Sequence, residues 1–157
     1  MDEVNPSYVK LMRYVEHNPA AVLSTIGDDG PLGAVVYVVV ASHGTLCFVT
    51  KNQTRKYANI IKHPEVSLTF FNEKEGTTLQ ATGKAFVAAN ADLKDYVLER
   101  MRKVHAIMAD WLPPITKLAD GEYVVIGVEL TYARLTEFGG LGIGGPTFTE
   151  LVPPFNK

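Results

Sequence analysis

The stretch that decides the fold runs from Ala21 to Thr50 and reads AVLSTIGDDGPLGAVVYVVVASHGTLCFVT. It holds three apolar runs separated by two turn sequences, in the order Ala21–Ile26, Gly27–Gly30 (GDDG), Gly33–Ala41, Ser42–Gly44 (SHG) and Thr45–Thr50. β-Branched residues favour strands, whereas glycine and aspartate favour tight turns. The middle run is apolar on both faces, which predicts a strand buried on both sides. Two strand–turn–strand units in succession predict an antiparallel meander.

Helices and further strands are predicted on both sides of this stretch. Apolar residues at helical spacing indicate helices over Ser7–His17, over about Thr54–Lys62, and from Asn90 or Asp92 to Pro113-Pro114. Strand patterns cover Val66–Phe71, Thr78–Ala88, Tyr123–Leu130 and Ala133–Phe138. Short strands with hairpin-type connections indicate a mainly β protein with flanking helices. We expect the sheet to close into a small antiparallel barrel, because closure removes exposed strand edges.

Composition indicates one globular domain over residues 1–157, with a barrel core over about 20–138 and a Gly- and Pro-rich tail over 139–157. Apolar residues make up 46% and charged residues 20%, which is enough apolar material for a core. The formal net charge is −2, so the chain lacks the basic excess of a nucleic-acid binder. No apolar run approaches the roughly 20 residues that cross a bilayer, and residues 1–6 lack a signal-peptide pattern. We expect a cytoplasmic protein that binds neither nucleic acid nor membrane.

Several kinds of active site are disfavoured by the residues present. Cys47 is the single cysteine, and its apolar neighbours predict a small buried residue. The four histidines show no metal-ligand spacing, so we expect no metal site. No GxSxG nucleophile sequence occurs. The glycines of 139–145 are followed by prolines rather than by a helix, which predicts a flexible tail or a flap over a cofactor instead of a dinucleotide-binding loop.

The most informative segment is Thr50–Tyr57, TKNQTRKY, where a strand ends and a helix begins. The first turn of a helix carries unpaired N–H groups and a partial positive charge, so added cations are locally unfavourable there. Arg55 and Lys56 nevertheless stand together in this turn, with Lys51 just before it. A bound phosphate would make the crowding favourable, because it accepts hydrogen bonds from N–H groups, Thr54 and both cations. The alternative is a basic surface turn exposed to solvent.

A family resemblance bears on this choice. The order and spacing of several short sequences over Leu23–Val87 resemble the flavin-binding split barrel of the pyridoxamine 5'-phosphate oxidase superfamily. These sequences are Leu23-Ser24-Thr25, Asp29-Gly30-Pro31, Leu46–Thr50, Thr54-Arg55-Lys56, Asn59-Ile60, His63–Val66 and Gln80–Ala85. The resemblance implies an antiparallel split β-barrel that binds FMN between the two subunits of a homodimer.

The resemblance also implies which residues hold the cofactor. The phosphate would be held by Thr54, Arg55 and Lys56. The ring system would lie along two strands and their rim, at Val35, Val36, Val49, Thr50, Lys51 and Asn52. A residue of the partner subunit near Thr78 or Gln80 would complete the site.

Departures from the oxidase pattern limit what the resemblance implies. The second strand has Ala34 and Val39 or Val40 where vitamin oxidases carry an arginine and a lysine, and Glu137-Phe138 is followed by glycines instead of a tryptophan and a basic motif. Tyr96 and Arg100 match the spacing of substrate-phosphate residues, but Val104 replaces the serine expected next, so both are interpreted as helix-surface residues. We therefore expect no authentic vitamin oxidase.

Three functions remain open. The first is a small flavin-dependent oxidoreductase that exchanges electrons with a small-molecule donor and acceptor, with no catalytic side chain identified. The second is a non-catalytic module that binds, stores or senses flavin, deazaflavin or haem. The third is a structural dimer without a ligand.

Overall fold

The computed structural model describes residues 5–107, 121–139 and 144–153, without the side chains of residues 105–107. Three α-helices and one short 3-10 helix flank the strands: α1 (Pro6–His17), η1 (Ser42–Gly44), α2 (Arg55–Lys62) and α3 (Ala91–Ile107). The strands are β1 (Ala20–Gly27), β2 (Gly30–Tyr37), β3 (Val39–Val40), β4 (Leu46–Lys51), β5 (Glu65–Asn72), β6 (Thr77–Val87), β7 (Tyr123–Glu137) and β8 (Thr147–Leu151). No helix in these ranges is long and apolar enough to cross a membrane.

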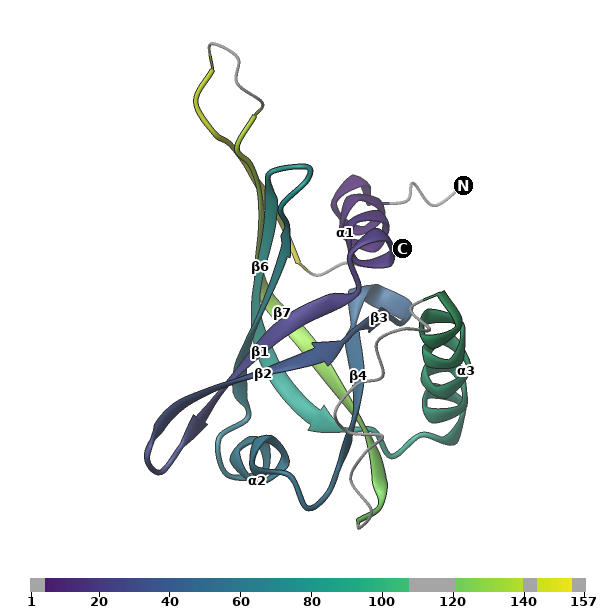
Figure 1. The fold of residues 1–157 in the computed structure, drawn as a ribbon. Helices are drawn as coiled ribbons and strands as arrows, with labels where there is room; N and C mark the ends of the chain where they lie inside the picture. Colours follow the sequence, from purple (N-terminus) through teal and green to yellow (C-terminus); the bar gives the residue numbers. More distant parts are fainter. Residues whose placement is uncertain (1–4, 108–120, 140–143, 154–157) are drawn as a thin grey trace.

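The strands form one antiparallel sheet in the order β2-β1-β5-β6-β7-β4-β3, and β8 pairs with the second half of β7. Strands β2 and β3 are the two ends of this order, yet only Val38 separates them in the chain. The sheet must therefore curl until its edges approach each other at Val38. Away from that point the edges of β2 and β4 diverge, and α2 lies between the tip of the β1–β2 hairpin and the lower end of β4 (Figure 1). The result is the expected split barrel.

Side-chain caps fix where the helices begin. The Asn5 side chain accepts a hydrogen bond from the N–H of Ser7 at 2.9 Å, and Pro6 follows as the first helical residue. The Asn90 side chain accepts hydrogen bonds from the N–H groups of Asp92 and Leu93, so Asn90 rather than Asp92 caps α3. Helix α1 therefore begins one residue before the predicted Ser7, and Asn90 was one of the two predicted starts of α3.

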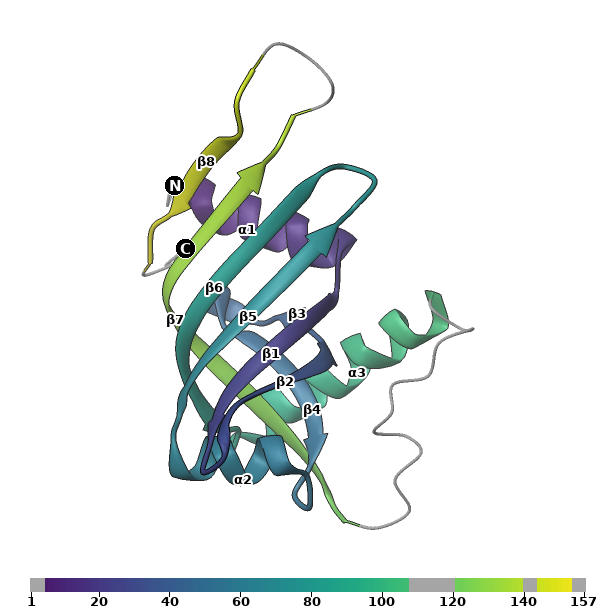
Figure 2. The same cartoon turned by 60° about the vertical axis from the view of Figure 1, so that its left-hand side comes forward.

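The core lies inside the curl of the sheet. Leu23, Phe48, Phe70 and Ile126 from four strands are fully buried there. Helix α1 covers one end through Leu11 and Val15, while α3 packs through Val97 and Met101. The outer face of the sheet is the face of β1, β5, β6 and β7 that points away from this core. Figure 2 looks onto this outer face and shows α1 and α3 behind the strands. The described helices therefore leave this outer face uncovered.

The predicted strand pair Tyr123–Leu130 and Ala133–Phe138 is wrong. One strand, β7, runs through the whole of Tyr123–Glu137. The register with β6 shifts between Thr82, which faces Tyr132, and Gly83, which faces Leu130. The extra residue, Thr131, is thus absorbed as a β-bulge, which bends the strand without ending it. Within the Gly- and Pro-rich tail, Thr147–Leu151 forms a strand that was not predicted, β8. Residues 140–143 of the predicted flexible tail or flap lie outside the described residues.

The predicted single strand Gly33–Ala41 is divided. Strand β2 ends at Tyr37, the N–H of Val38 donates to the carbonyl of Pro19 at 2.8 Å, and β3 begins at Val39. Burial on both faces holds from Val36 to Ala41 only, whereas Val35 is 47% exposed. The two hairpins exist, but β2 and β3 do not pair, so the predicted meander is wrong at this junction.

Candidate functional site

The start of α2 has the features of an anion site. The first intrahelical bond runs from the N–H of Ala58 to the carbonyl of Thr54, and the Thr54 hydroxyl accepts from the N–H of Tyr57 at 3.3 Å. The N–H groups of Arg55 and Lys56 precede these bonds and so have no acceptor within the helix. The first turn contains no acidic residue. Two free N–H groups and two cationic side chains are therefore brought together.

The surroundings of the Lys56 ammonium favour a bound anion. Its side chain is half-buried, and in the described part of the chain no carboxylate forms an ion pair with it. Desolvation of the ammonium lowers the pKa of Lys56 below its ordinary value. A bound anion would stabilise the charged ammonium. The residues at this helix start thus fit a phosphate group.

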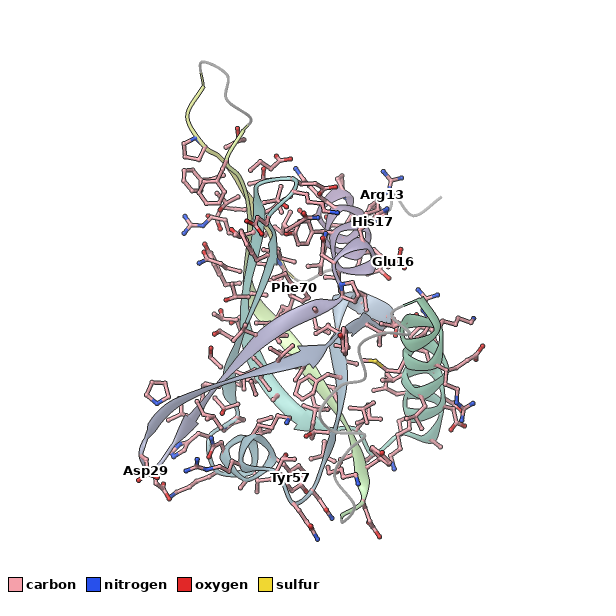
Figure 3. The ribbon with its side chains drawn as sticks, viewed as in Figure 1. Arg13, Glu16, His17, Asp29, Tyr57 and Phe70 are labelled. Carbon is pink, nitrogen blue, oxygen red and sulfur yellow. The ribbon has the colours of Figure 1, made fainter. Side chains whose placement is uncertain are left out.

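Arg55 lies on the exposed side of the same turn. Its guanidinium is 3.6 Å from the carboxylate of Asp29, and both side chains are exposed (77% and 93%). Figure 3 shows Asp29 at the tip of the β1–β2 hairpin, beside the helix that carries Tyr57. Such an exposed pair is weak and screened by salt, so Arg55 can exchange this partner for a phosphate at little cost.

Thr54 has a structural task in this arrangement. Its hydroxyl donates to the Lys51 carbonyl at 2.9 Å and lies 3.0 Å from the hydroxyl oxygen of the buried Thr50. These bonds join the end of β4 to the start of α2. The single hydroxyl proton of Thr54 is used here, so a phosphate would take it only if the hydroxyl turned.

The strands expected to hold a flat ring present two open backbone edges. Strand β2 is an edge of the sheet, and β3 pairs with β4 only at Leu46 and Cys47. The edge of β4 from Phe48 to Lys51 therefore has no strand partner on that side in the described chain. Val35 and Val49 are partly accessible, whereas Val36 and Thr50 are buried and could offer only backbone groups to a ligand.

Lys51 and Asn52, the two residues expected at the rim of the ring, make contacts that hold the β4–α2 loop in place. Lys51 is buried, with its ammonium 5.0 Å from the centre of the Tyr123 ring. Asn52 exchanges two bonds with Glu122: its N–H donates to the Glu122 carbonyl at 3.0 Å, and its side-chain oxygen accepts from the Glu122 N–H at 3.1 Å. Both contacts fix the β4–α2 loop against the start of β7.

Thr78 and Gln80 lie apart from the other candidate residues. They are on β6, which is three strands away from β2 in the sheet, a separation of about 14 Å at the usual strand spacing. Gln80 projects from the outer face. It belongs to a row of residues that are partners on adjacent strands, which runs across six strands through Val35, Val22, Thr69, Gln80, Arg134 and Glu150. Within one chain, then, Gln80 lies three strands away from the ring-binding edge of β2.

Two contacts near α2 were missed from the sequence. The side-chain amide of Asn59 donates to the hydroxyl of Thr25 at 3.0 Å, and Lys62 forms an ion pair with Asp28. A signal was present, because Thr25 occupies an inward position after Ala21 and Leu23 in the alternating pattern of β1. A polar side chain at such a position needs a hydrogen-bond partner.

Tyr96 and Arg100 have structural partners. The Tyr96 hydroxyl donates to the Val40 carbonyl at 3.1 Å, and Arg100 forms an ion pair with Glu16 at 2.9 Å. These contacts attach α3 to β3 and α1. They agree with the interpretation of both residues as part of the helix surface rather than of a substrate-phosphate site.

Two hollows among the described residues lie away from the start of α2. One, of about 600 Å³, is bounded by α1 together with Glu75 and Leu135, and the other, of about 430 Å³, lies on the outer face beside Ser67 and Thr82. Among the described residues, no group of three or more His, Cys, Asp or Glu side chains could hold a metal ion.

The comparison with protein families decides the relationship. The model of the family described as pyridoxamine 5'-phosphate oxidase matches residues 10–137, more than half of the chain. The chain belongs to this family. No curated protein sequence matches it.

Solved structures at low identity share the family fold. General Stress Protein 26 from Bacillus anthracis is 21% identical with a TM-score of 0.64, over 92% of this chain and 98% of that one. A pyridoxamine 5'-phosphate oxidase-related, FMN-binding protein from Nostoc punctiforme is 10% identical with a TM-score of 0.56, over 93% and 94%. A haem-binding protein from Mycobacterium smegmatis is 15% identical with a TM-score of 0.62, over 94% of this chain and 60% of that one. Solved structures with this fold are thus described with different ligands.

Proposed function

We propose that this chain is an FMN-binding flavoprotein whose cofactor phosphate binds at the start of α2. The observation that carries the proposal is the half-buried ammonium of Lys56, which has no carboxylate partner in the described chain and stands beside two N–H groups without helical acceptors. A phosphate dianion would satisfy all three groups, and Arg55 would add a bidentate contact. Membership of a family with an FMN-binding member supports the same choice.

The open edges of β2 and β4 support a flat ring beside this phosphate site. Val35 and Val49 offer apolar contact, and the unpaired backbone edge of β4 offers hydrogen bonds to the polar rim of the ring. Haem is a poorer fit, because its iron needs an axial ligand. None of the described histidine side chains is on β2 or β4: His17 ends α1, His43 is in η1, and His63 caps the far end of α2.

A homodimer completes the proposed site. Gln80 lies about 14 Å from β2 within one chain, so a second copy would have to supply it. The outer face that carries Gln80 has no described helix over it and exposes Val22, Val35 and Phe71 at 43%, 47% and 62%. An apolar sheet face of this kind is suited to an interface between copies. The cofactor would then lie between the subunits.

We further propose oxidoreductase activity with a small-molecule donor and acceptor. Bound FMN supplies the hydride and electron transfer, while the chain binds, orients and shields it. A flavin-storage or flavin-sensing module is the second candidate. It is favoured because Tyr96 and Arg100, whose spacing matches a substrate-phosphate site, have structural partners instead. Turnover with NADH or NADPH separates the two: the enzyme consumes the nucleotide, and the storage module does not.

The proposal is tested by an absorption spectrum of the purified protein and by mass analysis of what heating releases. We expect a flavin spectrum and FMN, and the analysis distinguishes FMN from a deazaflavin or haem. Titration of the apoprotein should give an affinity that falls at least about tenfold in the double variant Arg55→Ala/Lys56→Ala, since two charge-assisted contacts are lost. Unchanged affinity in the double variant removes the phosphate assignment. Sedimentation equilibrium should give a dimer, and a monomer that still binds FMN would contradict the shared site.

A further inference from the structure

The β1–β2 hairpin holds α2 at three points along its length. Asp29 pairs with Arg55 at the first residue of the helix, Thr25 contacts Asn59 in the middle, and Asp28 pairs with Lys62 at the last residue. The two ion pairs are exposed, so they are weak and depend on salt. Only the middle contact is protected: Thr25 is 2% exposed, and the Asn59 amide donates to its hydroxyl at 3.0 Å. Of the three polar contacts, this bond is therefore the durable one.

Asn59 also lies next to the two cationic residues in the first turn of α2. It follows Arg55 by four residues and Lys56 by three, so its side chain neighbours each of these two side chains on the helix surface. The absence of a side chain at Gly27 gives the amide room, because a Cβ there would lie 3.1 Å from the Asn59 nitrogen. Fixing Asn59 against β1 fixes the rotation of α2 about its own axis. The directions in which Arg55 and Lys56 project follow from that rotation.

We propose that Asn59, through its hydrogen bond to Thr25, is a positioning residue for the phosphate of the bound nucleotide. The inference rests on the proposed function and deepens it. Asn59 does not touch the phosphate; it sets the orientation of the helix start relative to β2, which carries the ring-binding edge. Its loss misaligns the phosphate contacts and leaves the ring contacts in place.

The experiment compares FMN with riboflavin, which has the same ring and no phosphate. Affinities are measured by quenching of flavin fluorescence with apoprotein of the wild type, Asn59→Ala, Thr25→Val and Thr25→Ser. We expect the wild type to prefer FMN at least about tenfold, since the phosphate adds charge-assisted contacts. Asn59→Ala and Thr25→Val should each weaken FMN binding about fivefold, the effect of one hydrogen bond, and change riboflavin binding less than about twofold. Thr25→Ser keeps the hydroxyl and should keep the wild-type ratio.

A matched control is Asn72→Ala. It removes another partly buried amide contact between elements, from Asn72 to the side-chain oxygen of Asn18 at 2.7 Å, far from α2. The ratio of FMN to riboflavin affinity should stay unchanged in this variant. A merely structural role of Asn59 would weaken both ligands equally or neither, and either result overturns the proposal. If Asn59→Ala does not fold, the near-isosteric Thr25→Val decides. A wild type without preference for FMN refutes the phosphate site itself, and with it the role of Asn59.

Discussion

Gly83 is a position where one added methyl group should be strongly destabilising. Gly83 stands at the register shift between β6 and β7, where a Cβ would lie 2.2 Å from the carbonyl oxygen of Glu129, 2.9 Å from its carbon and 3.0 Å from the Cα of Leu130. All three atoms are backbone, so no side chain can rotate away. Relief requires the two strands to separate by about 1 Å. We expect Gly83→Ala to cost about 2–4 kcal/mol, from overpacking and about one weakened ladder hydrogen bond.

The assay is thermal unfolding of the apoprotein followed by circular dichroism, at one protein concentration because a dimer would make the midpoint concentration-dependent. For a chain of this size, 2–4 kcal/mol corresponds to a midpoint lower by about 4–16 °C. Gly33→Ala is the matched control: it adds the same methyl group to a strand, where the nearest atom is Cγ1 of Val22 at an ordinary 3.4 Å. Its midpoint should stay close to the wild type. Equal midpoints for Gly83→Ala and Gly33→Ala would refute the close approach of β7 at the bulge.

Two further predictions concern single side chains. Asp29→Asn removes a carboxylate 3.6 Å from the Arg55 guanidinium. FMN should therefore bind about two- to threefold more tightly at low salt, and the gain should be lost at about 0.5 M salt. Weaker binding in a fluorescence titration would instead show that Asp29 orients Arg55. Burial raises the pKa of the Cys47 thiol to about 12, so native protein at pH 8 should react with Ellman's reagent only after unfolding, and rapid stoichiometric labelling would contradict its burial.

Much of the fold could be predicted from local chemistry. Asn5-Pro6 and Asn90 mark helix starts because the short amide side chain caps free N–H groups, and Gly30, with a φ of 112°, is a glycine that its turn requires. The bulge at Thr131 could not be predicted in the same way. The bulge depends on which residues of β6 face β7. This pairing is non-local, and no turn residue in the sequence indicates it.

Part of the candidate site could likewise be predicted from the sequence, and part could not. Thr54, Arg55 and Lys56 are consecutive, so their joint position at a helix start follows from the sequence itself. The distance of Gln80 from β2 follows from the strand order, and the contact between Thr25 and Asn59 joins residues 34 positions apart. The sequence could say only that an inward threonine needs a partner. Which partner it has is decided by how the sheet curls over α2.

Lys56 should show opposite effects on stability and on binding. Burial lowers the pKa of its ammonium, so the folded apoprotein holds a charge at neutral pH that the unfolded chain holds more easily. That penalty is present below the lowered pKa and disappears as the pH rises through it, since the unfolded chain then binds more protons than the folded one and stability rises with pH. Lys56→Met removes the charge and keeps the apolar stem. The variant should therefore unfold at a higher temperature than the wild type at pH 7, and the difference should shrink as the pH rises from the lowered pKa of Lys56 towards the ordinary lysine value of about 10.4.

The same substitution should weaken FMN binding and spare riboflavin, because only the phosphate uses the ammonium. Lys94→Met is the control, since Lys94 is exposed on α3 and its removal should change neither quantity. Three other groups with raised pKa values, Tyr8, Tyr14 and Tyr37, also titrate at high pH, but they are common to both proteins and cancel in the difference. A half-buried cation that destabilises the empty protein but strengthens FMN binding fits a role in holding the phosphate. If Lys56→Met destabilises the apoprotein and leaves FMN affinity intact, Lys56 has its counterion within the chain and the start of α2 is no phosphate site.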